Sequence, residues 1–292
     1  MFSLLHQLDV VLARDPGDYR PLQAAEESGG QQRKTTIEDA KRAAAVFAVN
    51  KYVRNNMVVG LGTGSTAKYA VEHIAKLINA KTLTNIIGVP TSRGTEELAR
   101  GLGIPLRDLN SLTKSNARGY LIDVAIDGAD AVDCCMNLIK GGGAALLREK
   151  MIEKAAERFI CIVDRSKVVL YFGGSADAVP LPVEITQFSH EHVMRVIRRV
   201  LQHRFCTVSQ RFERDGTTPV VTDNGNYIAD VCFHGAQLLV PQGAAAELET
   251  ITGVVEHGLF CGMAKVVVVA ETDGSVREIT TPAPGPHALN YY

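Results

Sequence analysis

Two aspartates, a lysine and a glutamate that could transfer protons lie close together in the chain. Asp127 and Asp130 follow an apolar run, 121–126, that is typical of a buried strand. Lys140 precedes three glycines, and a helical pattern that contains Glu149 begins at once after them. A Gly-rich turn that leads into a helix presents backbone N–H groups at the positive end of the helix dipole. This set of groups suits proton transfer on an oxygenated substrate.

Glu149 is the candidate general base in this set. Its neighbours at helical spacing include no cation and are mostly apolar: Ala145, Leu146, Ile152 and Glu153. A carboxylate on such a face is partly desolvated, which raises its pKa toward the range that a base needs near neutral pH. The alternative is an ordinary surface glutamate in a charged helix, and spacing alone does not decide between the two.

A second candidate site follows a short strand predicted over 57–61. It consists of Gly62, Thr63, Gly64, Ser65 and Thr66. A strand, a Gly/Ser/Thr turn and a helix form a phosphate-binding arrangement, because N–H groups and hydroxyls point at one spot. The turn is not a Walker sequence, and Ser65 stands where a dinucleotide fingerprint has its third glycine. A plain strand-to-helix turn is the alternative.

Alternating strands and helices must position these groups. The expected elements are a helix capped by Thr35 or Thr36, a strand over 57–61, a helix to 78, a strand over 85–89, a helix capped by Ser92, and strands over 104–106, 121–126 and 158–163. This alternation predicts a parallel sheet covered on both faces. Lys167 follows the last of these strands, beside the predicted site, although a solvated loop lysine is the commoner fate.

A second unit is predicted after a prolyl segment, 180–182. Its pattern is a strand over 183–188, a helix over 189–203, strands over 205–212 and 227–233, a helix over 244–250 and a strand over 254–255. This β-α-β-β-α-β order is typical of a ferredoxin-like module. Asp223, Asn224, Gly225 and Asn226 form a hairpin signal.

The predicted organisation therefore has two domains. Residues 35–180 plus 263–280 would form the α/β catalytic domain, and residues 181–262 the small α+β domain. Residues 1–34 read as a partly disordered extension and 281–292 as a proline-rich tail.

Composition excludes several classes of protein. The formal net charge of the 292-residue chain is −1, so nucleic acid is not an expected partner. No apolar run reaches the roughly 18 residues of a membrane span. Six cysteines without a C-x-x-C pair, and scattered histidines, predict neither a metal site nor a disulfide framework. The start of the chain lacks a basic region, so we expect a cytoplasmic protein, with organelle targeting by the extension left open.

Four stretches, 60–66, 127–130, 140–150 and 221–226, resemble the type A ribose-5-phosphate isomerases. The resemblance runs from about 35 to 279 in the family's order. The extension is not part of the usual pattern, and Ala131 replaces the family's acidic residue after the second aspartate. The resemblance implies a Rossmann-like, mostly parallel sheet domain with a smaller ferredoxin-like domain, and assembly as a homodimer or homotetramer.

The resemblance also implies an activity and its residues. The family interconverts D-ribose 5-phosphate and D-ribulose 5-phosphate through an enediolate, in the pentose phosphate pathway, without metal or cofactor. Glu149 matches the general base, Lys140 the cation near the reacting oxygens, and Asp127 a carboxylate that assists ring opening. The residues that match the family's substrate site are Thr63, Gly64, Ser65, Thr66, Asp127, Gly128, Ala129, Asp130, Lys140, Gly141, Gly142, Gly143 and Lys167. Lys41 is a weaker candidate for the phosphate.

Two other functions are open to related α/β folds. A sugar-phosphate sensor would keep the turn at 63–66 but would not need Glu149. A coenzyme A transferase would use a glutamate as its nucleophile and would require an acyl thioester. Incubation with ribose 5-phosphate alone separates these functions from an isomerase.

Overall fold

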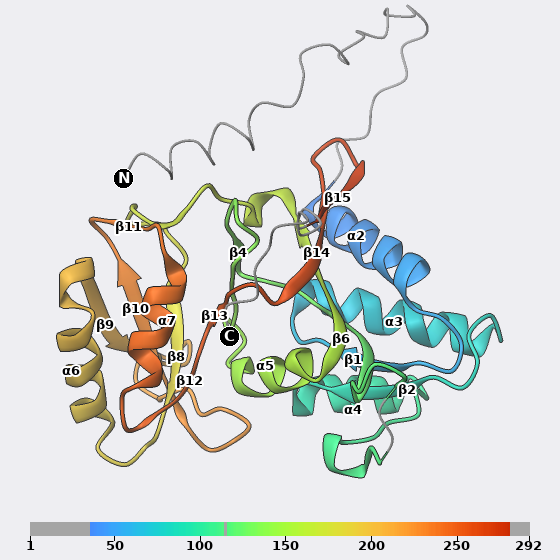
Figure 1. The fold of residues 1–292 in the computed structure, drawn as a ribbon, viewed down its shortest axis with the longest axis horizontal. Coiled ribbons are helices and arrows are strands. Elements are labelled where there is room, and N and C mark those ends of the chain that lie inside the picture. The colour runs from blue at the N-terminus through green and yellow to red at the C-terminus, as the bar shows by residue number, and fades with distance from the viewer. Residues whose placement is uncertain (1–35, 114–115, 281–292) are drawn as a thin grey trace, which may run out of the picture. The chain divides into compact units, whose positions relative to one another are not determined.

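A six-stranded sheet, flanked by helices, is the largest sheet of the protein's described residues (Figure 1). The computed structural model describes residues 36–113 and 116–280, and the predicted extension and tail lie outside them. The strand order is β15-β14-β6-β3-β1-β2, and the edge strand β15 runs antiparallel to β14 while the other pairs are parallel. The strands are β1 (Val58–Leu61), β2 (Ile87–Pro90), β3 (Ile122–Asp127), β6 (Ala156–Asp164), β14 (Ala264–Ala270) and β15 (Val276–Thr280).

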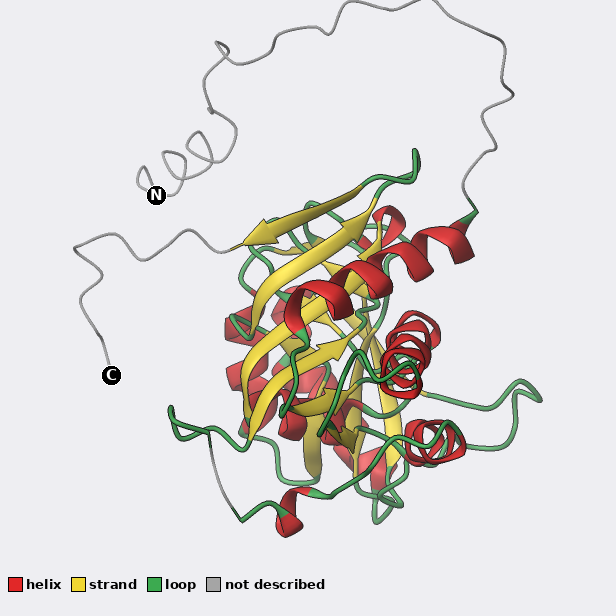
Figure 2. Cartoon of the chain, turned by 90° about the vertical axis from the view of Figure 1, so that its right-hand side faces the viewer, coloured by secondary structure: helices red, strands yellow, loops and turns green. Residues whose placement is uncertain are grey.

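Helices cover both faces of this sheet, as the alternating pattern predicts. The helices α2 (Ile37–Tyr52), α3 (Ser65–Asn79) and α4 (Arg93–Gly101) pack on one face and lie along one side of the strands in Figure 2. The helix α5 (Leu146–Lys154) packs on the other face. Successive residues of β6 separate the two cores, since Ile160 contacts the first and Cys161 the second. Both faces are therefore buried, which the apolar strands require.

Local capping sets where the helices begin. The Thr36 side chain accepts a hydrogen bond from Asp39 N at 3.1 Å, and the Asp39 side chain accepts one from Thr36 N at 3.2 Å. This reciprocal capping box makes Thr36 the N-cap of α2, and not the alternative Thr35. Ser92 caps α4 by accepting from Thr95 N at 3.0 Å. Both caps confirm the sequence prediction.

A four-stranded antiparallel sheet follows in the order β12-β8-β10-β9. Its elements are β8 (Leu181–Ile185), α6 (His190–Val200), β9 (Cys206–Gln210), β10 (Tyr227–Phe233), α7 (Pro241–Glu249) and β12 (Val254–His257). The prediction began the first strand at Val183, but β8 already includes Pro182. The Pro182 carbonyl accepts from Gly258 N at 2.7 Å, just beyond the end of β12, so the ring nitrogen points to that side and the missing N–H removes no bond to β10.

Two short pieces differ from the prediction. Residues 131–139, expected to be a plain connection, form a hairpin of β4 (Ala131–Val132) and β5 (Leu138–Ile139), and β5 also pairs with β13 (Leu259–Phe260). The predicted strand over 104–106 is wrong, because Leu106 forms only an isolated bridge with Gly88.

The remaining elements are small. They are β7 (Phe172–Gly173), which pairs with β11 (Gln237–Leu238), and the 3₁₀ turns η1 (Leu109–Ser111), η2 (Arg165–Lys167) and η3 (Gln202–Arg204). No helix within the described ranges is long and apolar enough to cross a membrane.

Candidate active site

Three glycine-containing segments meet at the carboxyl ends of β1 and β3. They are the turn after β1, the segment 127–130 at the end of β3, and the turn 140–145 before α5. Glycine is needed where they touch: a Cβ on Gly62 would lie 2.2 Å from the Asp127 side chain, and one on Gly142 would lie 2.6 Å from Asp130 Oδ1. The glycines therefore let the backbone approach the two aspartates.

The turn before α5 differs from the prediction in one respect. The helix does not begin directly after the glycines, because Gly141 and Ala144 have φ values of 104° and 57°. These left-handed residues hold a turn in which Gly142 N donates to Asp130 Oδ2 at 2.7 Å. The helix then begins at Leu146, which places Glu149 in its first turn.

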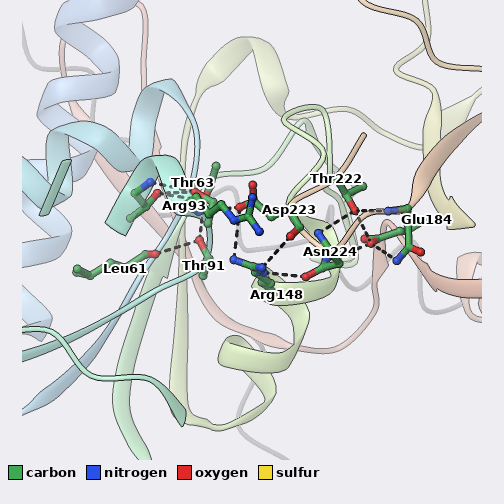
Figure 3. A network of polar contacts seen from close by, with 12 residues as sticks. Leu61, Thr63, Thr91, Arg93, Arg148, Glu184, Thr222, Asp223 and Asn224 are labelled. Atoms are coloured by element: carbon green, nitrogen blue, oxygen red, sulfur yellow. Dashed lines mark hydrogen bonds and ion pairs between the residues drawn. The ribbon is translucent and has the colours of Figure 1, made fainter. Parts of the chain in front are cut away.

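Side-chain hydroxyl groups from the segment after β2 support the turn after β1. Thr63 Oγ1 lies 2.7 Å from Thr91 Oγ1, 2.8 Å from Ser92 Oγ and 3.1 Å from Thr95 Oγ1 (Figure 3). Gly64 has a φ of 111°, and α3 begins at Ser65 with no side-chain cap. The N-terminal end of a 15-residue helix thus points into the site, where it favours an anion.

Lys140 is the centre of a buried charge cluster. Its Nζ lies 3.1 Å from Asp127 Oδ2, 3.3 Å from Glu153 Oε1 and 3.5 Å from Glu149 Oε1. It also donates to the Gly128 carbonyl at 2.6 Å. Since all four charged side chains are buried, one ammonium faces three carboxyl groups in a low-dielectric site.

This crowding shifts the protonation equilibria. Burial raises the pKa of Glu149 to about 8, against the opposing attraction of Lys140. Burial also raises the pKa of Glu153 well above its usual range. Burial disfavours the charged form of Lys140, but Asp127, Glu149 and Glu153 outweigh that effect and raise its pKa. Lys140 therefore stays charged at neutral pH, whereas Glu149 titrates close to neutral pH. The burial of Glu149 excludes the alternative of an ordinary surface glutamate.

A single cavity collects nearly every residue that the sequence singled out. Its lining residues are Thr63, Gly64, Ser65, Thr66, Gly128, Ala129, Asp130, Lys140, Gly141, Gly142, Gly143, Glu149 and Lys167. Asp127 lies beneath this cavity, where its Oδ1 accepts from Thr63 N at 3.0 Å and from Gly128 N at 2.7 Å. Lys41 is not in the lining and pairs with Glu38 on α2 at 2.7 Å.

Three contributors to the site were not foreseen. Glu153 was noted only as a like-charged neighbour of Glu149, yet it reaches Lys140 from the next helical turn. Thr91 and Thr95 support the Thr63 hydroxyl, and the hydroxyl-rich sequence after β2 was the available signal. Among the described residues, no group of three His, Cys, Asp or Glu side chains is arranged to hold a metal ion.

The fold and the cavity together define a class of protein. It is an α/β enzyme whose cavity combines a buried carboxyl of raised pKa, an ammonium and a helix N-terminus suited to an anion. Such a site suits proton transfer on a phosphorylated, oxygen-rich substrate.

Comparison with known proteins narrows this class. Residues 87–274 match the family model "Ribose 5-phosphate isomerase A (phosphoriboisomerase A)". "Probable ribose-5-phosphate isomerase 3, chloroplastic" from Arabidopsis thaliana is 45% identical over 237 residues, 81% of this chain and 82% of that protein. The structure of ribose 5-phosphate isomerase from Plasmodium falciparum superposes with a TM-score of 0.77 at 35% identity, over 85% of this chain and all of that chain (100%).

A second solved structure includes a ligand. A D-ribose-5-phosphate isomerase in complex with phospho-erythronic acid has a TM-score of 0.75 and 36% identity, over 84% of this chain and 100% of its own. The chain belongs to the ribose 5-phosphate isomerase A family. It is an aldose–ketose isomerase that interconverts D-ribose 5-phosphate and D-ribulose 5-phosphate in the pentose phosphate pathway.

Proposed function

We propose that Glu149 is the general base that moves a proton between C1 and C2 of the sugar through an enediolate. The observation that carries this role is the burial of Glu149 in the cavity lining, 3.5 Å from the Lys140 ammonium. Its Oε2 has no hydrogen-bond partner within the described part of the chain, so it can accept a proton from a bound substrate. A carboxyl with a pKa of about 8 is a stronger base than an exposed one.

Lys140 stabilises the negative charge of the enediolate in this proposal. The ammonium is fixed by the Gly128 carbonyl and by Asp127 before the substrate arrives. A preorganised cation in a dry site stabilises developing charge more than it stabilises a neutral ground state. Asp127, which lies beneath the cavity, contributes to ring opening and to hydroxyl binding through Lys140 and the backbone that it holds.

The opposite end of the cavity binds the phosphate and hydroxyls of the sugar. The N-terminus of α3, with Ser65 and Thr66, is suited to the phosphate, and Lys167 adds a cation. Asp130 and the glycines 141–143 line the wall that would face the sugar hydroxyls. The relative that binds phospho-erythronic acid supports this arrangement, because that ligand combines a phosphate, hydroxyls and a planar carboxylate that resembles an enediolate.

Glu149→Gln tests the proposal. Glutamine keeps the shape of the side chain but cannot take up a proton, so kcat should fall by about 10²–10⁴-fold with little change in KM. Exchange of the C2 proton of ribose 5-phosphate with deuterated water should slow in parallel. Glu96→Gln is the matched control, since Glu96 pairs with Arg100 on α4 and is not in the cavity lining. Near-parental kcat and exchange in folded Glu149→Gln would remove Glu149 as the base.

The proposal extends to the domains, the oligomeric state and the location of the protein. We propose two domains, 35–180 plus 263–280 and a ferredoxin-like 181–262, and a homodimer or homotetramer without nucleic-acid or membrane partners. The β12-β8-β10-β9 order with α6 and α7 supports the ferredoxin-like assignment. We also propose a cytoplasmic location, with the chloroplastic relative as the reason to test organelle import of the full chain. Sedimentation and a fluorescent fusion would measure these two properties.

A further inference from the structure

The loop 222–226 takes no part in the proposed chemistry, although the sequence analysis singled it out. It belongs to the segment between β9 and β10 and is organised around Glu184 of β8, which is fully buried. Glu184 Oε1 accepts from Thr222 Oγ1 at 2.8 Å, from Asn226 Nδ2 at 2.8 Å and from Asn224 Nδ2 at 3.1 Å. Three donors on one buried carboxylate oxygen give the loop a defined conformation.

The outer side of this loop holds Arg148 (Figure 3). Arg148 Nε donates to Asn224 Oδ1 at 2.8 Å, and its Nη2 donates to the Asp223 carbonyl at 3.0 Å. Its Nη1 lies 3.5 Å from Asp223 Oδ2, the atom that accepts from Arg93 N at 2.7 Å. The guanidinium fork thus binds two loop residues at once, in a geometry that a lysine cannot reproduce.

Arg148 immediately precedes Glu149 in the first turn of α5. Consecutive helical residues point about 100° apart. Glu149 faces the substrate cavity, whereas Arg148 lines a second cavity of about 720 Å³ on a different face of the helix. Arg148 is absent from the substrate-cavity lining, so its effect on the reaction would be indirect.

The first turn of α5 has no side-chain cap, whereas further along the helix Lys150 Nζ donates to Glu256 Oε1 and to the His257 carbonyl, both at 2.6 Å. The helix has nine residues, and its N-cap is Ala145. Its buried residues are Leu146, Glu149, Lys150, Ile152 and Glu153, of which three are charged. A cation in a first helical turn also opposes the helix dipole, so the local sequence does not favour arginine there. The contacts of Arg148 with the loop are what compensate for this placement.

We propose that Arg148 is a positioning residue that sets the rotation of α5, and with it the direction of the Glu149 carboxylate, through Asp223 and Asn224. This inference rests on the proposed role of Glu149 as the base. A carboxylate roughly 6 Å from the helix axis moves by about 1 Å when the helix turns by about 10°. A misplacement of about 1 Å at a reacting group can cost about 10²-fold in rate.

Arg148→Met tests the proposal, because methionine keeps much of the apolar stem and removes the fork. We expect kcat to fall by about 10–100-fold while KM changes by less than about twofold. Arg148→Lys should lose less than Arg148→Met, since it keeps the charge but not the two-residue contact. Arg100→Met is the matched control: Arg100 lines the same second cavity, pairs with Glu96 on its own helix and is expected to retain parental kinetics.

The double variant Glu149→Gln/Arg148→Met separates this inference from the proposed function. If Arg148 acts through Glu149, adding Arg148→Met to Glu149→Gln should lower the residual kcat by less than about twofold. An inactive Glu149→Gln with a fully active Arg148→Met would refute the positioning role alone, and an active Glu149→Gln would refute the base assignment itself. An equal loss in Arg100→Met, or a rise in KM alone, would also refute the positioning role. If Arg148→Met does not fold, the kcat of Arg148→Lys is the test instead. A parental kcat in Arg148→Lys would then refute the positioning role.

Discussion

The pKa of Glu149 predicts how activity depends on pH. The base must be ionised to accept a proton, and burial raises the pKa of Glu149 to about 8. The value of kcat/KM should therefore rise with pH and level off above about 8, with a slope near one on logarithmic axes below it. The substrate phosphate titrates near pH 6, so the range from pH 7 upward isolates the enzyme group.

The raised pKa of Glu149 also predicts that stability falls as pH rises, whereas activity increases. Glu149 has a raised pKa in the folded protein, so between about 4.5 and 8 the folded state holds a proton that the unfolded state has lost. The free energy of unfolding should fall as pH rises through this window, by about 1.4 kcal/mol per pH unit for one proton. The full shift corresponds to about 5 kcal/mol at most. Glu153, whose pKa is also raised by burial, acts with the same sign.

Glu149→Gln should flatten both curves. Steady-state kinetics give the pH profile of kcat/KM, and urea unfolding at several pH values gives the free energy. The variant should lose activity yet become more stable than the parent above pH 8, because the cost of a buried charge is removed. A parental kcat/KM that stays flat from pH 7 to 9, or a variant whose stability keeps the parental slope, would refute the reasoning.

Three further outcomes are expected. Lys140→Met should lower kcat more than it raises KM, by about 10²-fold or more, because the ammonium contributes most when the enediolate charge develops; a change in KM alone would make Lys140 a binding residue. Exhaustive chelation should leave kcat unchanged, and loss of activity restored by one metal would overturn this. Deletion of residues 1–33, which lie outside the described residues, should leave kcat/KM and Tm nearly unchanged, and a large drop in either would show that they pack on the folded chain.

Much of the fold followed from local sequence. The apolar runs over 57–61 and 121–126 predicted β1 and β3, and Thr36 and Ser92 predicted two helix starts, because periodicity and capping act within a few residues. The short strands were harder to predict. Two-residue strands such as β4 and β5 have too little sequence to show a period, and the pairing of β5 with β13 depends on residues more than 100 positions away.

The sequence by itself determined which groups the site contains. Gly62, Asp127, Lys140 and Glu149 stand in motifs whose chemistry can be read without coordinates. Their electrostatic state was decided only by the tertiary structure. The pattern around Glu149 showed no cation, yet Lys140, nine residues earlier, and Glu153 on the next turn meet it in one buried cluster.

The contact between Arg148 and Asn224 shows the same limit most clearly, since the two residues are 76 positions apart. Arg148 adjoins Glu149 in the sequence, but the sequence cannot tell which surface the guanidinium will meet. The buried Glu184 of β8 holds the loop 222–226, and this loop meets α5 through Arg148. Local sequence thus determined which groups react, and the packing of distant segments determined their pKa values and orientation.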